Sequence, residues 1–277
     1  MTHVVTGLLG DTARRDYARK LQLFNAFAEP ELRASIADLE LRAGARVLDA
    51  GCGTGEAVAW LRAAVGESGV VIGMDLATAH VRSARDIAPA ATIVQGDMLH
   101  PCFAEGNFDL VWTVNAINHL HEPVAGIRIL SNLLRVGGRI AIGQSSFLPD
   151  MYFAWDARLE RAVNEAVRAY YRDRYGRSER EFTGVRGLAG WLQQAGLQGI
   201  GVRTRIIERA YPLDPADENY LLEAIFRGTW GERLRGYMDP EDFEDLMRLC
   251  DPGDGRYALR RADFHFLQSF TLAVATR

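Results

Sequence analysis

The fold of this 277-residue chain is decided by the segment VLDAGCGTGE, residues 47–56. An apolar strand pattern ends there in an acid, and three alternating glycines lead directly into a helical pattern. Glycine reaches backbone dihedrals that are closed to other residues, and it lets the backbone pass close to a ligand. The first turn of the following helix offers unpaired N–H groups to the same ligand. The segment therefore predicts a strand, a tight ligand-binding turn and a helix.

Short apolar runs alternate with helical patterns on both sides of this segment, which is typical of parallel strands joined by crossover helices. The expected strands are Arg46–Ala50, Val70–Asp75, Thr92–Gln95, Phe108–Val114, Arg139–Gly143, Ile200–Glu208 and Phe264–Ala275. The expected crossover helices are Glu56–Val65, Thr78–Ile87, Pro123–Arg135 and Gly187–Ala195. These elements predict an α/β fold: a doubly wound, mostly parallel seven-stranded sheet with helices on both faces.

Further helical segments precede or interrupt this alternation and predict a helical cap. Helices are expected at Thr12–Ala28, Glu31–Leu39 and Met151–Tyr171, and residues 212–250 have an acid-rich helical pattern. Open α/β sheets bind ligands at the carboxyl ends of their strands, so a cap gathered there would cover a pocket. The predicted organisation is N-terminal cap helices at 1–40, a ligand-binding core at 41–146, a cap insertion at 147–183, a core continuation at 184–211, a second helical insertion at 212–260 and a final core strand at 261–277.

Composition narrows the class of function. The net charge of −4 argues against an extended nucleic-acid surface, because such surfaces neutralise phosphates with lysine and arginine. Three widely spaced cysteines predict neither a disulfide framework nor a zinc site. No run approaches the ~20 apolar residues that cross a bilayer, and the first residues lack a signal-peptide pattern. We expect a cytoplasmic protein without a nucleic-acid or membrane partner.

Polar residues follow the ends of the next three expected strands. Asp75 ends the second strand, where a carboxylate can accept hydrogen bonds from ribose hydroxyls or cap the next helix. The third strand is followed by Gly96, Asp97 and Met98, and the fourth by Asn115. The carboxyl ends of such strands are the usual ligand site of an open α/β sheet. The pattern therefore predicts one binding site that these residues share with the glycine turn.

This order of motifs resembles the class I, seven-stranded S-adenosylmethionine-dependent methyltransferases, whose first motif also runs strand, acid and GxGxG. The resemblance implies S-adenosylmethionine as the cofactor and S-adenosylhomocysteine as the product. It implies that the glycine turn wraps the methionine part of the cofactor and that the acid lies near its ammonium group. The residues that match this motif are Asp49, Gly51, Cys52 and Gly53.

The later motifs extend the resemblance through residue 146. It implies that Asp75 binds the ribose, that Asp97 contacts the adenine amine, that Met98 packs on the adenine ring and that Asn115 lies beside the methionine part and the acceptor. The neighbouring residues expected at the cofactor are Leu76 and Gly96. The chain departs from the family's LxPGG turn at Val136, which replaces the proline and affects the rigidity of the turn rather than the chemistry.

Small-molecule members of the family often close an N-terminal helix over the cofactor with a tyrosine or a glutamine. Tyr17 and Gln22 are the candidates in this chain. Both residues also suit an ordinary amphipathic helix, so the pattern leaves their role open.

Methyl transfer from a sulfonium is an in-line displacement, so the enzyme supplies proximity, alignment and, for a hydroxyl or a protonated amine, a base. His119 and His121 follow Asn115 closely and are expected on the loop beyond the fourth strand. Histidine, with an ordinary pKa of about 6.5, suits proton removal at neutral pH. His119 is the candidate base, with loop packing as its alternative role, and the reaction requires no metal.

The predicted function is transfer of the methyl group of S-adenosylmethionine to an oxygen or nitrogen atom of a small, secondary-metabolite-like acceptor. A cyclase or decarboxylase that binds S-adenosylmethionine without methyl transfer is the alternative on the same fold. An NAD-dependent dehydrogenase is disfavoured, because its GxGxxG motif would need the third glycine one residue after Gly55. The expected partner is the small-molecule acceptor, and the sequence leaves a homodimer open.

Overall fold

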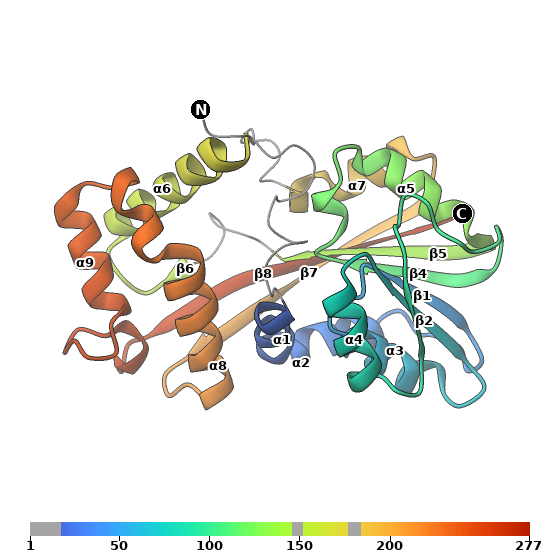
Figure 1. The fold of residues 1–277 in the computed structure, drawn as a ribbon, viewed down its shortest axis with the longest axis horizontal. Coiled ribbons are helices and arrows are strands. Elements are labelled where there is room, and N and C mark those ends of the chain that lie inside the picture. The colour runs from blue at the N-terminus through green and yellow to red at the C-terminus, as the bar shows by residue number, and fades with distance from the viewer. Residues whose placement is uncertain (1–17, 146–151, 177–183) are drawn as a thin grey trace.

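The computed structural model describes residues 18–145, 152–176 and 184–277 (Figure 1). Its centre is one sheet in the order β3-β2-β1-β4-β5-β8, with β7 on the other edge of β8. The two-residue β6 extends the β5 side of β8. The strands are β1 Arg46–Ala50, β2 Val70–Asp75, β3 Thr92–Gln95, β4 Phe108–Val114, β5 Leu134–Ser145, β6 Tyr152–Phe153, β7 Gln198–Ala210 and β8 His265–Thr276.

The first five strands are parallel, and β8 runs antiparallel to both β5 and β7. The first four strands have the bounds that the apolar runs predict. The predicted bounds Arg139–Gly143, Ile200–Glu208 and Phe264–Ala275 are wrong, because β5, β7 and β8 pair over longer or shifted ranges. The doubly wound, seven-stranded fold is confirmed, and β6 is a short addition to it.

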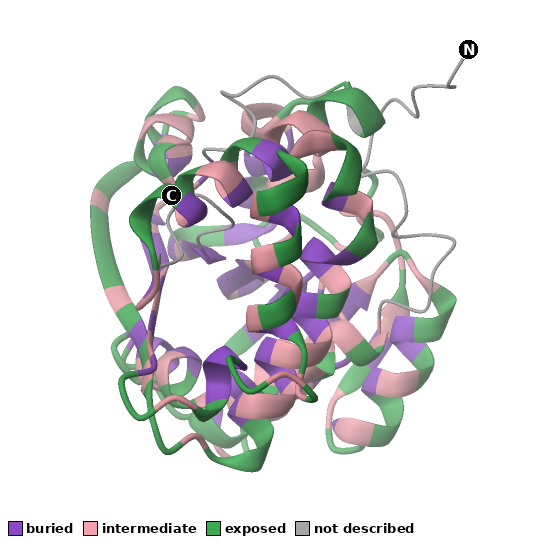
Figure 2. Cartoon of the chain, turned by 90° about the vertical axis from the view of Figure 1, so that its left-hand side faces the viewer, coloured by how far each residue is buried: buried purple, intermediate pink, exposed green. Residues whose placement is uncertain are grey.

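Helices cover both faces of the sheet (Figure 1). One face packs against α1 Ala18–Phe27, α2 Glu29–Ala37, α3 Glu56–Val65 and α4 Thr78–Ile87, and the other against α5 Pro123–Asn132 and α7 Gly184–Gln194. Each helix turns its buried residues inward, and Figure 2 shows the exposed residues on the outer sides. Alternate residues of each strand therefore belong to two separate cores, one on each side of the sheet.

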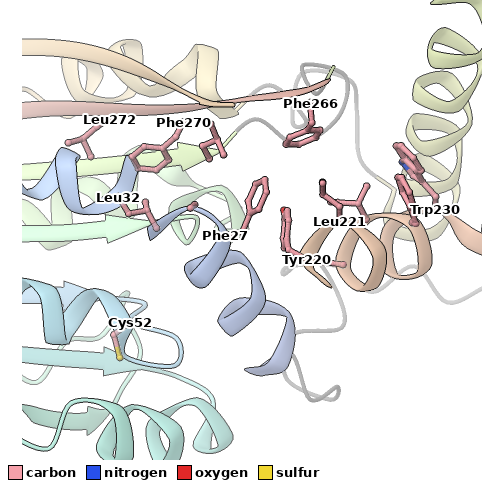
Figure 3. Close-up of a cluster of buried hydrophobic side chains, with 14 of the residues drawn as sticks. Phe27, Leu32, Cys52, Tyr220, Leu221, Trp230, Phe266, Phe270 and Leu272 are labelled. Carbon is pink, nitrogen blue, oxygen red and sulfur yellow. The ribbon is translucent and has the colours of Figure 1, made fainter. Parts of the chain in front are cut away.

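The remaining helices gather at the far end of β7 and β8, and we call them the helical lobe (Figure 1). They are α6 Ala157–Tyr175, α8 Pro215–Tyr220, the π-helix η3 Leu221–Trp230, the 3₁₀ helices η4 Gly231–Tyr237 and η5 Ala258–Arg260, and α9 Pro240–Cys250. Phe226 and Trp230 of η3 pack on Phe153 of β6, with ring centroids 5.9 Å and 5.2 Å apart, and Phe153 in turn packs on Phe266 of β8 at 4.8 Å. Figure 3 shows Phe27 of α1 between Phe266 and Tyr220, so the lobe and the first helix share one apolar cluster.

Several predicted boundaries are wrong. α5 ends at Asn132 rather than at Arg135, because Leu134 already pairs with Phe108 as the first residue of β5. Residues 152–153 form β6 rather than the start of a helix, and α6 begins at Ala157, where Asp156 caps it. α2 spans Glu29–Ala37 rather than Glu31–Leu39. The first expected helix is described only from Ala18, because its residues 12–17 lie outside the described part of the chain. The division of the chain into core and cap segments stays a prediction.

Candidate active site

A cavity of about 460 Å³ opens at the carboxyl ends of β1, β2 and β4. Its volume lies in the range of small-molecule sites. It gathers most of the residues that the sequence predicts for a site: Asp49, Gly51, Cys52, Gly53, Asp75, Leu76, Gly96, Asp97, Met98, Asn115 and His119. The parallel strand ends therefore bring together residues that are far apart in the chain.

The glycine turn can pack against its neighbours only because it lacks side chains. Gly51 and Gly53 have φ of 81° and 53°, which other residues rarely adopt. A Cβ at Gly51 would lie 2.6 Å from the Cβ of Ala116, and one at Gly53 would lie 3.1 Å from Leu21. Between them, burial raises the pKa of the Cys52 thiol, with Asp49 as the next cause, so this cysteine stays a neutral wall residue.

Asp49 ends β1 beneath this turn and is 2% exposed. Its Oδ2 has no hydrogen-bond partner in the described part of the chain. Burial raises the pKa of Asp49 well above its usual value, and the nearby carboxylates of Asp75 and Glu56 raise it further. A buried acceptor without a donor is costly, so this site is suited to a positively charged ligand group.

Asp75, at the end of β2, is held by three donors. Its Oδ2 accepts from the backbone N–H of Gly53 at 2.9 Å, and its Oδ1 accepts from Ala77 N–H at 2.9 Å and lies 3.1 Å from Nδ1 of His80. Burial acts to raise the pKa of Asp75, but the hydrogen bonds from His80, Ala77 and Gly53 together lower it. Asp75 is therefore an ionised carboxylate, and the cap residue of α4 is Ala77.

Sequence reasoning missed His80, which lies in the first turn of α4, is 7% exposed and lines the cavity. A signal was available, because the side chain lies five residues after a predicted site acid on the next helix. The turn geometry that brings the imidazole back to the carboxylate is not visible in the sequence.

The segment after β3 forms the next part of the wall. Oδ1 of Asp97 accepts a hydrogen bond from the backbone N–H of Leu99 at 2.8 Å, and Oδ2 lies 3.1 Å from Nδ1 of His100. A Cβ at Gly96 would lie 3.0 Å from the sulfur of Met74, so a glycine fits closely there. Leu76 is 53% exposed at the cavity rim, where an apolar ligand surface could cover it.

Asn115 follows β4 with φ of 53°, a left-handed conformation that asparagine tolerates. Its Oδ1 accepts from the backbone N–H and the hydroxyl of Ser145, at 2.8 Å and 3.0 Å, which ties the ends of β4 and β5 together. His119 ends the short helix η1 Ile117–His119 and lines the cavity. His121 is exposed and is not among the lining residues.

The helix α1 forms part of the cavity wall. Leu21, Phe24 and Asn25 line the wall, and Nδ2 of Asn25 donates to Oε2 of Glu56 at 2.7 Å. Gln22 is exposed instead and donates to the hydroxyl of Ser83 at 3.2 Å. Tyr17 lies outside the described residues.

Residues 47–138, which contain the glycine turn and most of this wall, match the model of a methyltransferase domain. Over 211 residues the chain is 30% identical to the demethylmenaquinone methyltransferase of Beutenbergia cavernae, across 73% of this chain and 85% of that protein. The chain belongs to the class I S-adenosylmethionine-dependent methyltransferases. This methyltransferase is also 32% identical over 117 residues to the 27-O-demethylrifamycin SV methyltransferase of Amycolatopsis mediterranei, across 40% of this chain and 42% of that protein.

Solved structures support the same fold. The YcgJ protein from Bacillus subtilis has a TM-score of 0.55 at 16% identity and covers 90% of this methyltransferase and 99% of its own chain. A phosphoethanolamine N-methyltransferase of Haemonchus contortus has a TM-score of 0.53 at 17% identity, over 97% of this chain and 60% of its own. Within the described residues, each helix is too short or too polar to span a membrane.

The cavity of the methyltransferase fits S-adenosylmethionine in its chemistry. The unpartnered oxygen of Asp49 suits the ammonium group of the methionine part, and the glycine turn leaves its backbone open beside it. The ionised Asp75 keeps an acceptor position on Oδ2, which has one donor, and this position suits a hydroxyl. The nucleotide-like and amino-acid-like ends of the cofactor therefore each find matching groups.

Proposed function

We propose that this methyltransferase transfers the methyl group of S-adenosylmethionine to an oxygen or nitrogen atom of a small, secondary-metabolite-like acceptor. The observation that carries the proposal is that His119 lines the same cavity as Asp49 and Asp75, just beyond Asn115. A proton acceptor at that place serves a hydroxyl or ammonium acceptor. Relatives named for a demethylated rifamycin and for demethylmenaquinone give further support for a small acceptor.

The proposed cofactor contacts follow the chemistry of the wall. Asp49 accepts from the ammonium group, and Asp75 accepts from a ribose hydroxyl through Oδ2. The backbone of the glycine turn, with Cys52, lies along the methionine part. The adenine lies in the segment after β3, against Leu76, Gly96, Asp97 and Met98.

S-Adenosylmethionine, when bound, supplies an electrophilic methyl group on a sulfonium centre. The chain's part in the reaction is to align the acceptor, exclude water and take up a proton. His119 accepts the proton that the acceptor oxygen or nitrogen loses. Asn115, held by Ser145 across the strand ends, borders the place where acceptor and cofactor meet. The side chains of Phe24 and Leu32 give the cavity an apolar wall.

The test is turnover on a panel of phenols, alcohols, amines and a demethylmenaquinone, with S-adenosylhomocysteine and the methylated product measured together. The proposal predicts equal amounts of both, with the new methyl group on oxygen or nitrogen. Conversion of an acceptor without S-adenosylhomocysteine would instead identify a cyclase or a decarboxylase. A product methylated on a quinone ring carbon would contradict the O or N assignment.

We also propose that the protein works in the cytoplasm and that it binds neither nucleic acid nor a membrane, and the sequence leaves a homodimer open. Cys52, Cys102 and Cys250 form no disulfide in the structure, which is consistent with a reducing compartment. Light scattering on the purified chain tests the dimer.

A further inference from the structure

Two polar atoms in the wall of the cofactor cavity have no hydrogen-bond partner in the described part of the chain: Oδ2 of Asp49 and Nε1 of Trp112. Both side chains are buried, at 2% and 1% exposure. One atom is an acceptor and the other is a donor. Buried polar groups are almost always paired in native proteins, so each requires an explanation.

The two residues are neighbours across the sheet. Asp49 of β1 and Trp112 of β4 are register partners in a parallel ladder, so their side chains point to the same face. That face is the one covered by α2 and α3, because Trp112 belongs to the same buried cluster as Leu32 and Leu61. The donor and the acceptor therefore lie close together in one wall of the cavity.

Among the described residues, the rest of this wall offers a ligand carboxylate no lysine or arginine, and of its two histidines His80 lies against Asp75. The indole N–H of Trp112 is a buried donor that is not already used, so it is available to a ligand carboxylate. Apolar neighbours such as Phe24 and Leu32 lower the local dielectric, which strengthens a hydrogen bond to a charged group.

We propose that Trp112 and Asp49 together bind the amino-acid end of the cofactor. Trp112 Nε1 donates to the α-carboxylate, and Asp49 Oδ2 accepts from the α-ammonium group. The inference rests on the proposed cofactor contacts and adds to them a residue that determines specificity for a ligand with an α-amino-acid group.

The test is Trp112→Phe, which removes the indole N–H and keeps an aromatic ring. Calorimetry compares three ligands: S-adenosylhomocysteine, its decarboxylated analogue, which keeps the amine, and 5′-methylthioadenosine, which has neither group. Trp112→Phe should lower the affinity for S-adenosylhomocysteine about tenfold or more, as expected for the loss of a hydrogen bond to a charged group. The affinities for the other two ligands should stay unchanged. Asp49→Asn should lower the affinity for the two ligands that carry the amine and leave the affinity for 5′-methylthioadenosine unchanged.

Trp230→Phe is the matched control. Trp230 also has a buried indole N–H without a partner among the described residues, but it lies in the helical lobe and is not in the cavity wall. Its replacement should leave the affinity for all three ligands unchanged. Far-ultraviolet circular dichroism confirms that each variant is folded before calorimetry.

Two results overturn the inference. Unchanged binding of S-adenosylhomocysteine by Trp112→Phe would show that the indole contacts only an ordered water, and an equal loss for all three ligands would show a general distortion. A wild-type protein that binds none of the three ligands would instead overturn the proposed cofactor contacts themselves. The two failures are therefore distinguishable.

Discussion

Nδ1 of His80 lies 3.1 Å from Oδ1 of Asp75, and both side chains line the cofactor cavity. This contact determines which oxygen of Asp75 faces a ligand. Oδ1 is occupied by His80 and by Ala77 N–H, whereas Oδ2 has only the N–H of Gly53. His80 therefore holds the carboxylate, and we propose that it is a positioning residue for the oxygen that accepts from a ribose hydroxyl.

Variants of His80 should separate this positioning from general packing. The amide nitrogen of asparagine can take the place of Nδ1, so His80→Asn should keep the affinity for S-adenosylhomocysteine within about twofold of wild type. His80→Ala should weaken it about tenfold, the effect of one hydrogen bond to a charged group. Calorimetry with the 2′,3′-dideoxy analogue provides the control, because its affinity should not change. An equal loss for both ligands would assign His80 to packing alone.

Cofactor affinity should depend on pH through Asp49. Burial raises the pKa of Asp49 above its ordinary 3.8, so the folded protein holds this proton more tightly than the unfolded chain does. Its contribution to stability is present below pH 3.8 and is lost as the pH rises through the raised value. A ligand ammonium group favours the carboxylate, so binding releases a proton and affinity rises with pH in this window.

The measurement is calorimetry of S-adenosylhomocysteine in buffers of different ionisation enthalpy, which counts the protons released. Asp49→Asn should abolish the release and, because asparagine does not titrate, should raise the unfolding free energy of the ligand-free protein at a pH above the raised pKa of Asp49. Wild-type binding without proton release across this window would show that Asp49 does not meet the ammonium group.

His119→Ala should lower kcat about 10²-fold if the imidazole takes the acceptor proton. The affinity for S-adenosylhomocysteine should stay near the wild-type value, because the base contacts the acceptor rather than the cofactor. His121→Ala is the matched control, since His121 is exposed and outside the cavity wall. Steady-state kinetics on the best acceptor measures the effect, and a near-normal kcat for His119→Ala would assign this histidine to loop packing.

Gly51→Ala should destabilise the fold and close the cofactor site. The new methyl group would lie 2.6 Å from the Cβ of Ala116, at a φ of 81°. We expect the free energy of unfolding to fall by about 2–5 kcal/mol, because the left-handed backbone and the overpacked contact both destabilise the variant. Gly137→Ala is the control, because Gly137 has φ of 76° with nothing within 4 Å. The free energy of unfolding of Gly137→Ala should fall by only about 1–2 kcal/mol. Urea unfolding measures both, and equal losses would exclude the contact as a cause.

The strand ends were predictable because they depend on local patterns. The boundaries of β1, β2, β3 and β4 agree with the apolar runs, since a buried strand must stop where polar residues and glycine begin. The left-handed turn at Gly51 follows from the lack of a side chain. These patterns are enough to indicate that one ligand site lies at the ends of the strands.

The helix α1 was harder to interpret. Both Gln22 and Asn25 are polar residues of one amphipathic helix, and only the packing of α1 against the glycine turn and α4 decides which of them faces the cavity. The start of β5 was mispredicted for a similar reason, because Leu134 joins the sheet by pairing with Phe108, far away in the chain.

By itself, the sequence determined the alternation of strands and helices, the glycine turn and the acids at the strand ends, because these follow from backbone conformation and short-range periodicity. Only the tertiary structure decided that His80 holds Asp75 and that Trp112 lies beside Asp49. Hydrogen-bond partners and shared cavity walls depend on how segments far apart in the chain pack against one another. A local sequence pattern does not specify that packing.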